Sequence, residues 1–235
     1  MSRNTMPRMY EIRDLLSDPE SPNSFFRNFD VSIAEIAVKR KIFTDLEAEL
    51  QGLDDAAWNY LKHQVAPLFE RRNPPRGWQA TFDKLNQAKA YNHLARSGCT
   101  DVEFVEESTQ PGAKTPDLQA MQGPDKVLCE VKTINPSDVE AVARTTGAAR
   151  GVQGELQAPF FDKLRSTIET ARHQMAGYHA GIARRIVYVI LNFDDNLHEY
   201  VASYAPQLQA FASSSAAEGL EIVFDIKPKF YTATA

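Results

Sequence analysis

The sequence predicts an α/β protein in which a mixed β-sheet flanked by helices follows an N-terminal helical region. Residues 1–77 show mainly helical periodicity, whereas residues 78–235 contain β-rich apolar runs that come to alternate with amphipathic helices. With 235 residues, 43% of them hydrophobic, the chain can bury such a core without disulfides. We therefore expect a helical region at 1–77 and an α/β domain at 78–235.

Capping residues and prolines divide the N-terminal region into helices. Ser32 and Glu35 match the capping-box pattern, which predicts that a helix begins at Ser32. Asp54 or Asp55 can cap the next helix, and Pro67 is expected to bend or break it. The predicted helices cover residues 9–16, 32–50 and 55–69.

The second region is expected to begin after the basic, proline-rich connector Arg71–Trp78. Three successive strands favour a meander, and strands that then alternate with helices make the sheet mixed. Residues 135–158 show no sustained period and are predicted to form a loop. The predicted order is a helix at 79–97, strands at 102–106, 117–121 and 127–134, a helix at 160–178, a strand at 185–193, a helix at 200–211 and a strand at 220–226.

Composition favours a soluble, cytoplasmic protein. The two cysteines, Cys99 and Cys129, offer no disulfide framework, and no signal peptide opens the chain. The longest apolar run, Ile186–Leu191, is too short to span a bilayer, so no membrane partner is expected. The net charge of −5 argues weakly against a nucleic-acid coat protein but leaves room for local basic surfaces.

Charged residues interrupt the apolar strand predicted at 127–134. Because side chains alternate along a strand, Glu130 and Lys132 share one face with Leu128. Buried charges are costly unless they are paired or bind a metal. A second carboxylate, Asp117, follows Pro116 at the start of the preceding strand, 13 positions before Glu130, which is enough for a hairpin.

This succession, Pro116-Asp117 followed by Glu130-Val131-Lys132, resembles the PD-(D/E)-x-K nuclease superfamily, which has the restriction-endonuclease-like fold. The resemblance covers roughly residues 78–226 and leaves the N-terminal helices unaccounted for. It implies a restriction-endonuclease-like mixed β-sheet flanked by helices. It also implies a metal-dependent nuclease that hydrolyses DNA, with RNA as an alternative substrate and with endonuclease or exonuclease action left open.

The resemblance assigns roles to four residues. Asp117 and Glu130 would hold Mg²⁺, with Mn²⁺ as a substitute, because hard oxygen ligands select these ions. The backbone carbonyl of Val131 would be a third ligand, and Lys132 would orient or activate the attacking water. Without a metal, Glu130 and Lys132 would form a simple salt bridge and Asp117 would only cap a turn.

The preceding helix departs from the family pattern. Members often place a glutamate there, whereas this chain has Gln87 at that position and Asp83 one turn earlier, on the same predicted stripe. Either could supply a metal ligand. The number of metals is therefore open, and the alternative is a catalytically inactive nuclease-fold module that binds nucleic acid or a protein partner.

Four further residues are candidates for nucleic-acid binding. Gln174 and Tyr178 form a Q-x-x-x-Y pattern that resembles an auxiliary motif of RecB-like exonucleases, although an amphipathic helix can also carry them for packing. Arg144 and Arg150 lie in the predicted loop, which is expected to close over the site; the alternative is a short helix at 137–145.

Other functions have less support. The histidines lack zinc-binding spacing, and the chain has no Walker loop or G-x-S-x-G motif. A remaining alternative is an interaction protein that forms a homodimer, or binds another protein, through its N-terminal helices.

Overall fold

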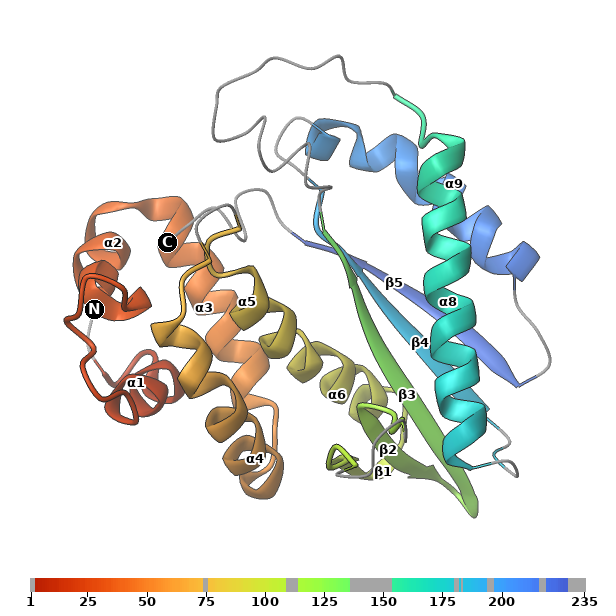
Figure 1. Ribbon diagram of the computed structural model, residues 1–235, viewed down its shortest axis with the longest axis horizontal. Coiled ribbons are helices and arrows are strands. Elements are labelled where there is room, and N and C mark those ends of the chain that lie inside the picture. Colours follow the sequence, from red (N-terminus) through yellow and green to blue (C-terminus); the bar gives the residue numbers. More distant parts are fainter. Residues whose placement is uncertain are drawn as a thin grey trace. The chain divides into compact units, whose positions relative to one another are not determined.

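The computed structural model describes residues 3–73, 76–108, 114–135, 154–179, 182, 184–193, 197–215 and 219–227. These residues fall into two compact units (Figure 1). The first, here called the helical unit, consists of the described residues up to Asn92. The second, the α/β unit, begins at His93, so the boundary lies inside helix α6 (Gln87–Arg96).

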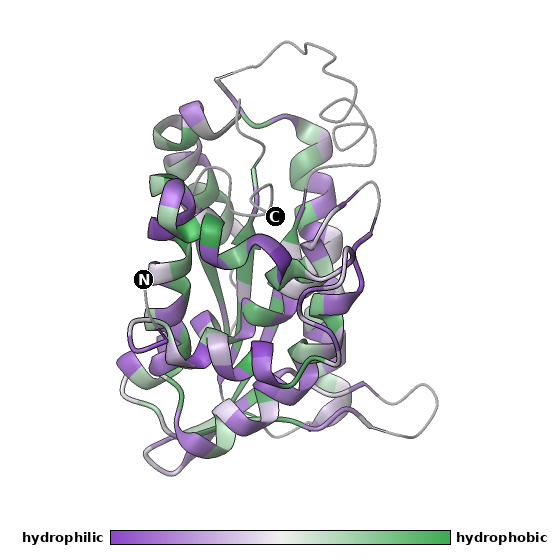
Figure 2. Ribbon diagram, turned by 90° about the vertical axis from the view of Figure 1, so that its left-hand side faces the viewer, coloured by the Kyte–Doolittle hydropathy of each residue, from purple (hydrophilic) through white to green (hydrophobic). Residues whose placement is uncertain are grey.

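Aromatic rings form the centre of the helical unit. The Phe25 ring lies 5.0–6.0 Å from six other rings: those of Phe26, Phe29, Phe43, Phe69, Trp78 and Phe82. The helices carry polar and apolar residues side by side, as amphipathic helices do (Figure 2). They are α1 (Pro7–Asp14), η1 (Phe25–Asn28), α2 (Phe29–Glu35), α3 (Ala37–Gln51), α4 (Asp55–Val65), η2 (Ala66–Glu70), α5 (Gln79–Leu85) and the start of α6.

The single helix predicted at 32–50 is wrong, because Ile36 is extended and separates α2 from α3. Ser32 lies inside α2 and caps nothing. The guanidinium of Arg40 donates to the carbonyl oxygens of Ile33, at 2.7 Å, and of Ala34. These hydrogen bonds give partners to carbonyl oxygens at the C-terminal end of α2 that the helix itself leaves unpaired. They therefore stabilise a break that the local capping pattern did not indicate.

The expected cap and break in the third helix are confirmed. The Asp54 carboxylate accepts a hydrogen bond from the backbone N–H of Ala57 at 2.8 Å, which is the usual N-cap arrangement. Helix α4 ends at Val65, and Pro67 lies in the first turn of η2. The helix predicted at 79–97 is instead two helices, α5 and α6, because a turn at Asn86 divides it.

The α/β unit contains a five-stranded mixed sheet, as predicted. Its strands follow the order β1-β2-β3-β4-β5. The first three strands pair antiparallel and the last three pair parallel. The strands are β1 (Thr100–Phe104), β2 (Leu118–Gln122), β3 (Asp125–Ile134), β4 (Arg184–Leu191) and β5 (Leu220–Ile226).

Helices α8 (Ala158–Tyr178) and α9 (Val201–Ser215) lie on one side of this sheet (Figure 1), and the short η3 (Leu197–Tyr200) leads into α9. The buried side chains of α8 and α9 form one apolar cluster with those of β3 and β4. On the other face, the His93 ring in the last turn of α6 lies 5.3 Å from the ring of Tyr188. The His93 ring therefore lies against the face of the sheet opposite α8 and α9.

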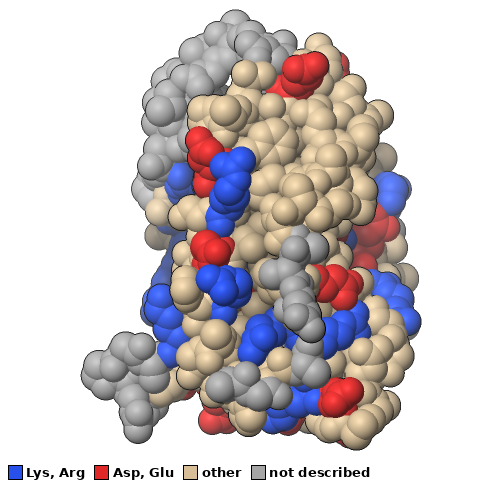
Figure 3. Space-filling model, turned by 90° about the vertical axis from the view of Figure 1, so that its right-hand side faces the viewer, with Lys and Arg blue, Asp and Glu red and all other residues tan. Residues whose placement is uncertain are grey.

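Helix α9 contains no charged residue, and a broad uncharged area is visible on the side of the α/β unit where α8 and α9 lie (Figure 3). No helix in the part of the chain described above is long and apolar enough to cross a membrane.

Leu164 tests how α8 is held on the sheet. It is fully buried in the apolar cluster, so Leu164→Ala should lower the free energy of unfolding by about 2–5 kcal/mol through lost burial and the cavity that remains. The exposed neighbour Ser166→Ala should change it by less than about 0.5 kcal/mol. Urea denaturation measures both, and equal losses would contradict the packing described here.

Candidate active site

Asp117 and Glu130 face each other across two neighbouring strands. Strand β2 begins at Leu118, which pairs with Cys129 of β3, so the antiparallel register places Asp117 opposite Glu130. Residues directly opposite in an antiparallel pair project from the same face of the sheet. Pro116 immediately precedes this point and has no backbone N–H to donate to a ladder. The two carboxylates therefore stand together where β2 begins.

Beyond this point, β3 continues without β2 beside it. The backbone N–H of Val131 donates to Oδ2 of Asp117 at 2.8 Å, so a side chain takes the place of the missing strand. In an antiparallel ladder, the N–H and C=O of one residue point to the same neighbouring strand. The Val131 carbonyl therefore lies on the same edge of β3 as Asp117. This arrangement puts three oxygen-bearing groups at one place: the carboxylates of Asp117 and Glu130 and this carbonyl.

Glu130 is a buried carboxylate on the face of β3 that α8 covers. It shares this face with the core residues Leu128 and Ile134, and only 2% of it is exposed. Its Oε1 lies 2.5 Å from Nζ of Lys132, and its Oε2 accepts a hydrogen bond from Nε2 of Gln174 at 3.0 Å. Both carboxylate oxygens are thus engaged, one by a cation and one by an amide.

The electrostatic environment of Glu130 opposes its ionisation. Burial is the main cause, the charge of Asp117 is the second, and together they raise the pKa of Glu130 to about 7. Lys132 and a backbone hydrogen bond from Asp117 act in the opposite direction. At neutral pH, Glu130 is therefore divided between its protonated and ionised forms, so a cation placed beside it would favour ionisation.

Gln174 connects α8 with β3 and with the segment that leads into β2. Besides Glu130, its Nε2 donates to the backbone carbonyl of Thr115, two residues before Asp117. The Q-x-x-x-Y pattern predicts a nucleic-acid-binding role for Gln174 and does not indicate these contacts. The available signal was its place on α8 beside the buried residues Ala171 and Met175, which brings it to the edge of the apolar stripe. The nucleic-acid role of Gln174 stays a prediction.

The other candidate residues belong to other parts of the fold or fall outside the described residues. Tyr178, at the end of α8, is 36% exposed. Arg144 and Arg150, with the predicted lid and its alternative helix at 137–145, fall outside the described residues. Asp83 on α5 is half-buried and Gln87 at the start of α6 is buried. They belong to the helical unit and lie on different helices, separated by the turn at Asn86, and their role as metal ligands stays a prediction.

The acidic cluster is small. Across the described ranges, no group of three or more His, Cys, Asp or Glu side chains is placed to hold a metal ion. The nearby Cys129 is fully buried on the opposite face of β3, and burial raises the pKa of its thiol well above the ordinary value. Cys129 is thus an unreactive core residue. Any metal at this site would be held by the two carboxylates and by neutral oxygen atoms.

In comparisons with known proteins, no family model, curated protein or solved structure matches the chain.

The cause of the raised pKa of Glu130 can be tested by changing its two charged neighbours. Asp117→Asn removes a negative charge and should lower this pKa from about 7 toward the ordinary 4.5. Lys132→Met removes the positive charge and should raise it. ¹³C NMR titration of the glutamate carboxyl groups measures both shifts. The exposed Asp125→Asn is the control and should leave the pKa unchanged; equal values in all variants would contradict the electrostatic picture.

Proposed function

We propose that this protein is a metal-dependent nuclease that hydrolyses phosphodiester bonds of DNA, and that its α/β unit has the restriction-endonuclease-like fold. The observation that carries the proposal is the grouping of Asp117, Glu130 and Lys132 on one face of the sheet where β2 begins. These are the residue types that phosphodiester hydrolysis requires: oxygen ligands for a divalent cation and a fixed positive charge near the reacting phosphate.

The order of elements supports the same proposal. A helix precedes three meandering strands, and a second helix leads to a fourth strand that pairs parallel to the third. The sequence resemblance to the PD-(D/E)-x-K superfamily implies this order. Glu130 and Lys132 lie on β3, and Asp117 immediately precedes β2.

The residues present fit a Mg²⁺ ion. Mg²⁺ is usually bound through one or two carboxylates while water and substrate phosphate complete its shell, so the pair Asp117 and Glu130 is sufficient. After burial, the negative charge of Asp117 is the second cause of the raised pKa of Glu130. A cation beside the two acids would offset this repulsion. The carbonyl of Val131 would be the third protein oxygen. When bound, such an ion polarises the phosphate and lowers the pKa of a coordinated water.

The neighbouring groups would hold these ligands in place. The backbone N–H of Val131 fixes one oxygen of Asp117, and Gln174 fixes one oxygen of Glu130. Pre-arranged ligands lose little conformational freedom when substrate binds. The ammonium of Lys132 is partly exposed, so it can donate a hydrogen bond to the attacking water or to a phosphate oxygen while it offsets developing negative charge.

One observation favours a second candidate, an inactive module of the same fold that binds nucleic acid or a protein. Lys132 already neutralises Glu130 at 2.5 Å, and no third acidic or histidine ligand joins the pair among the described residues. In such a site, the ion pair with Lys132 and partial protonation of Glu130 can take the place of a metal. Calorimetric titration with Mg²⁺ and Mn²⁺ separates the candidates, because the inactive module would show no site-specific binding that depends on Asp117 and Glu130.

The direct test is incubation of the full chain with Mg²⁺ or Mn²⁺ and with linear, circular or single-stranded DNA, with RNA as a parallel substrate. The proposal expects cleavage that EDTA stops. A folded preparation that cleaves none of these substrates would overturn it, and the absence of metal binding at Asp117 and Glu130 in the same preparation would favour the second candidate.

Lys132→Ala should abolish cleavage and retain metal binding, because the substitution removes a charge near the reacting phosphate but no ligand. The assay should be run at about pH 8.5, since loss of Lys132 raises the pKa of Glu130 and makes protons compete with the metal near neutrality. Asp117→Asn and Glu130→Gln should lose both properties. Cleavage rates should fall by several powers of ten in all three variants. Wild-type rates in Lys132→Ala would reject its assigned role.

The affinity for Mg²⁺ should depend on pH through Glu130. Because its pKa is about 7, the carboxylate is mostly protonated at pH 6, and binding of the ion must release that proton. The affinity should therefore rise by about fivefold between pH 6 and pH 7 and by about tenfold between pH 6 and pH 8, and level off above that. Calorimetry at these pH values, repeated in buffers of different ionisation enthalpy, measures the affinity and the protons released. An affinity that is constant from pH 6 to pH 8.5 would count against Glu130 as a ligand.

A further inference from the structure

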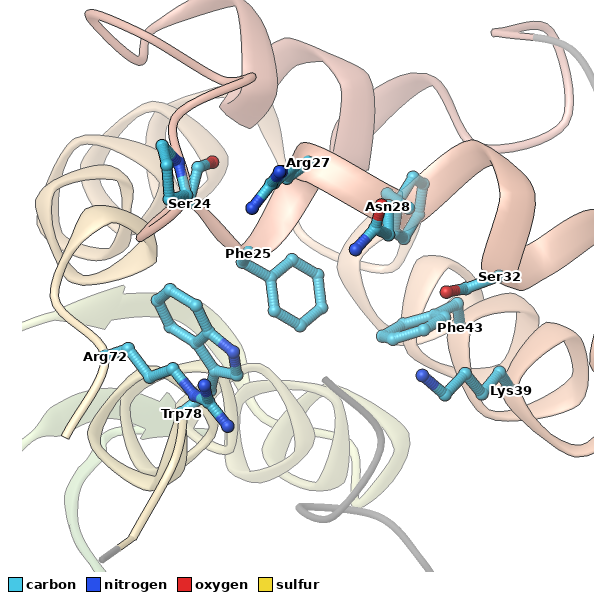
Figure 4. A pocket seen from close by; sticks show the side chains of 11 residues that line it. Ser24, Phe25, Arg27, Asn28, Ser32, Lys39, Phe43, Arg72 and Trp78 are labelled. Carbon is cyan, nitrogen blue, oxygen red and sulfur yellow. The ribbon is translucent and has the colours of Figure 1, made fainter. Parts of the chain in front are cut away.

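The helical unit contains a pocket of about 320 Å³ that the proposed nuclease function does not use. Its walls come from several segments: the chain from Pro22 to Ser32, the start of α3 and the connector before α5. Figure 4 shows the side chains that surround it. It is lined by Pro22, Ser24, Phe25, Arg27, Asn28, Phe29, Ser32, Lys39, Phe43, Arg72 and Trp78.

Aromatic rings form the apolar part of the pocket. Phe25, Phe43 and Trp78 are between 1% and 7% exposed and belong to the central ring cluster of the unit. The ring of Phe25 lies 5.6 Å from those of both Phe43 and Trp78, with edge-to-face geometry. These rings are held by their neighbours, so they offer a pre-formed surface for a planar apolar group.

Three cations lie at the same pocket: Arg27, Lys39 and Arg72. In Figure 4 their side chains extend toward the space around Phe25 and Trp78. The lining includes no carboxylate, and the described residues provide none of the three with an ion pair or a side-chain hydrogen bond. Partial burial lowers the pKa of Lys39, as expected for an ammonium held away from water without a counter-ion.

Neutral polar groups complete the lining. Asn28 and Ser32 bring an amide and a hydroxyl to the wall near Phe43 (Figure 4). Such groups can donate hydrogen bonds to an anion or to the edge of a base. The pocket thus combines two kinds of surface. The three cations, with no carboxylate among the lining residues, favour an anion, and the aromatic rings favour a flat ring.

We infer that this pocket binds a phosphate-bearing nucleotide, either a free mononucleotide or the phosphorylated terminal nucleotide of a nucleic-acid strand. The phosphate would contact the cations, and the base would lie against the aromatic rings, the combination used in sequence-independent recognition of single strands. The volume lies near the lower end of the roughly 300–1,000 Å³ typical of small-ligand sites, which suits one nucleotide. All the lining residues belong to the helical unit, so the inference is independent of the proposed nuclease site.

Calorimetric titration of the full chain in EDTA tests the inference without cleavage. The probes are adenosine monophosphate, adenosine and inorganic phosphate. The nucleotide should bind saturably and at least about tenfold more tightly than either of its parts, because each part engages only half of the pocket. No saturable binding of the nucleotide, or adenosine binding as tightly as the nucleotide, would overturn the inference. Inorganic phosphate that binds as tightly as the nucleotide would also overturn it, because the rings would then contribute nothing.

Single variants assign the contacts. Arg27→Gln, Lys39→Gln and Arg72→Gln should each weaken nucleotide binding by about tenfold, the effect expected for loss of one charge-assisted hydrogen bond. The matched control is Lys41→Gln on the same helix as Lys39, since Lys41 is exposed and paired with Asp45 and does not line the pocket. It should change affinity by less than about twofold. Equal effects in the control and in the pocket variants would mean non-specific charge attraction and would overturn the inference.

Two oligonucleotides distinguish the sources of the nucleotide. A single strand with a 5′-phosphate should bind more tightly than the same strand without it if the pocket takes strand ends, whereas equal binding assigns the pocket to free nucleotides. Lys132→Ala separates this inference from the nuclease proposal, because it should lose cleavage and bind the nucleotide with wild-type affinity.

Discussion

A buried carboxylate sets the main constraint on the α/β unit. Glu130 occupies a core position of β3, where an uncompensated charge would cost several kcal/mol. Two groups, Lys132 and Gln174, therefore have to reach it, one from the same strand and one from α8. Helix α8 is thus held by its apolar stripe and also by a polar contact at a fixed point of the sheet. The packing of the helix and the electrostatics of the site depend on each other.

The point at which β2 begins is equally important for the site. Because β2 begins at Leu118, the edge of β3 beyond Cys129 has no strand beside it on that side, and Asp117 occupies the place where pairing would continue. A longer β2 would pair the same backbone groups with another backbone and would take the place of the Asp117 carboxylate. The interruption of the sheet therefore puts carboxylate oxygens next to a rigid strand, which is the support that a precise binding site needs.

The sequence predicted the features that depend on strict local rules. Alternation along a strand places Glu130 and Lys132 on one face whatever surrounds them, and the mixed sheet followed from the succession of apolar runs and helices. The breaks at Ile36 and Asn86 were missed; at Ile36, side-chain hydrogen bonds from the Arg40 guanidinium to the end of α2 outweigh the capping pattern. The link from Gln174 to Thr115 spans 59 positions, and no periodicity indicates a contact at such a distance. The pocket of the helical unit, assembled from separate segments, was missed for the same reason.

The hydrogen bond between Val131 and Asp117 has a consequence for how the site can be observed. The backbone N–H of Val131 donates to a side-chain carboxylate and not to the backbone of another strand. A side chain can move more freely than a paired strand. The exchange rate of the Val131 amide with deuterated solvent and its chemical shift therefore follow the position and ionisation of Asp117, while the amides paired with β2 follow only the opening of the sheet. The protein thus carries, in its own backbone, a spectroscopic probe of this carboxylate that requires no label attached to the site.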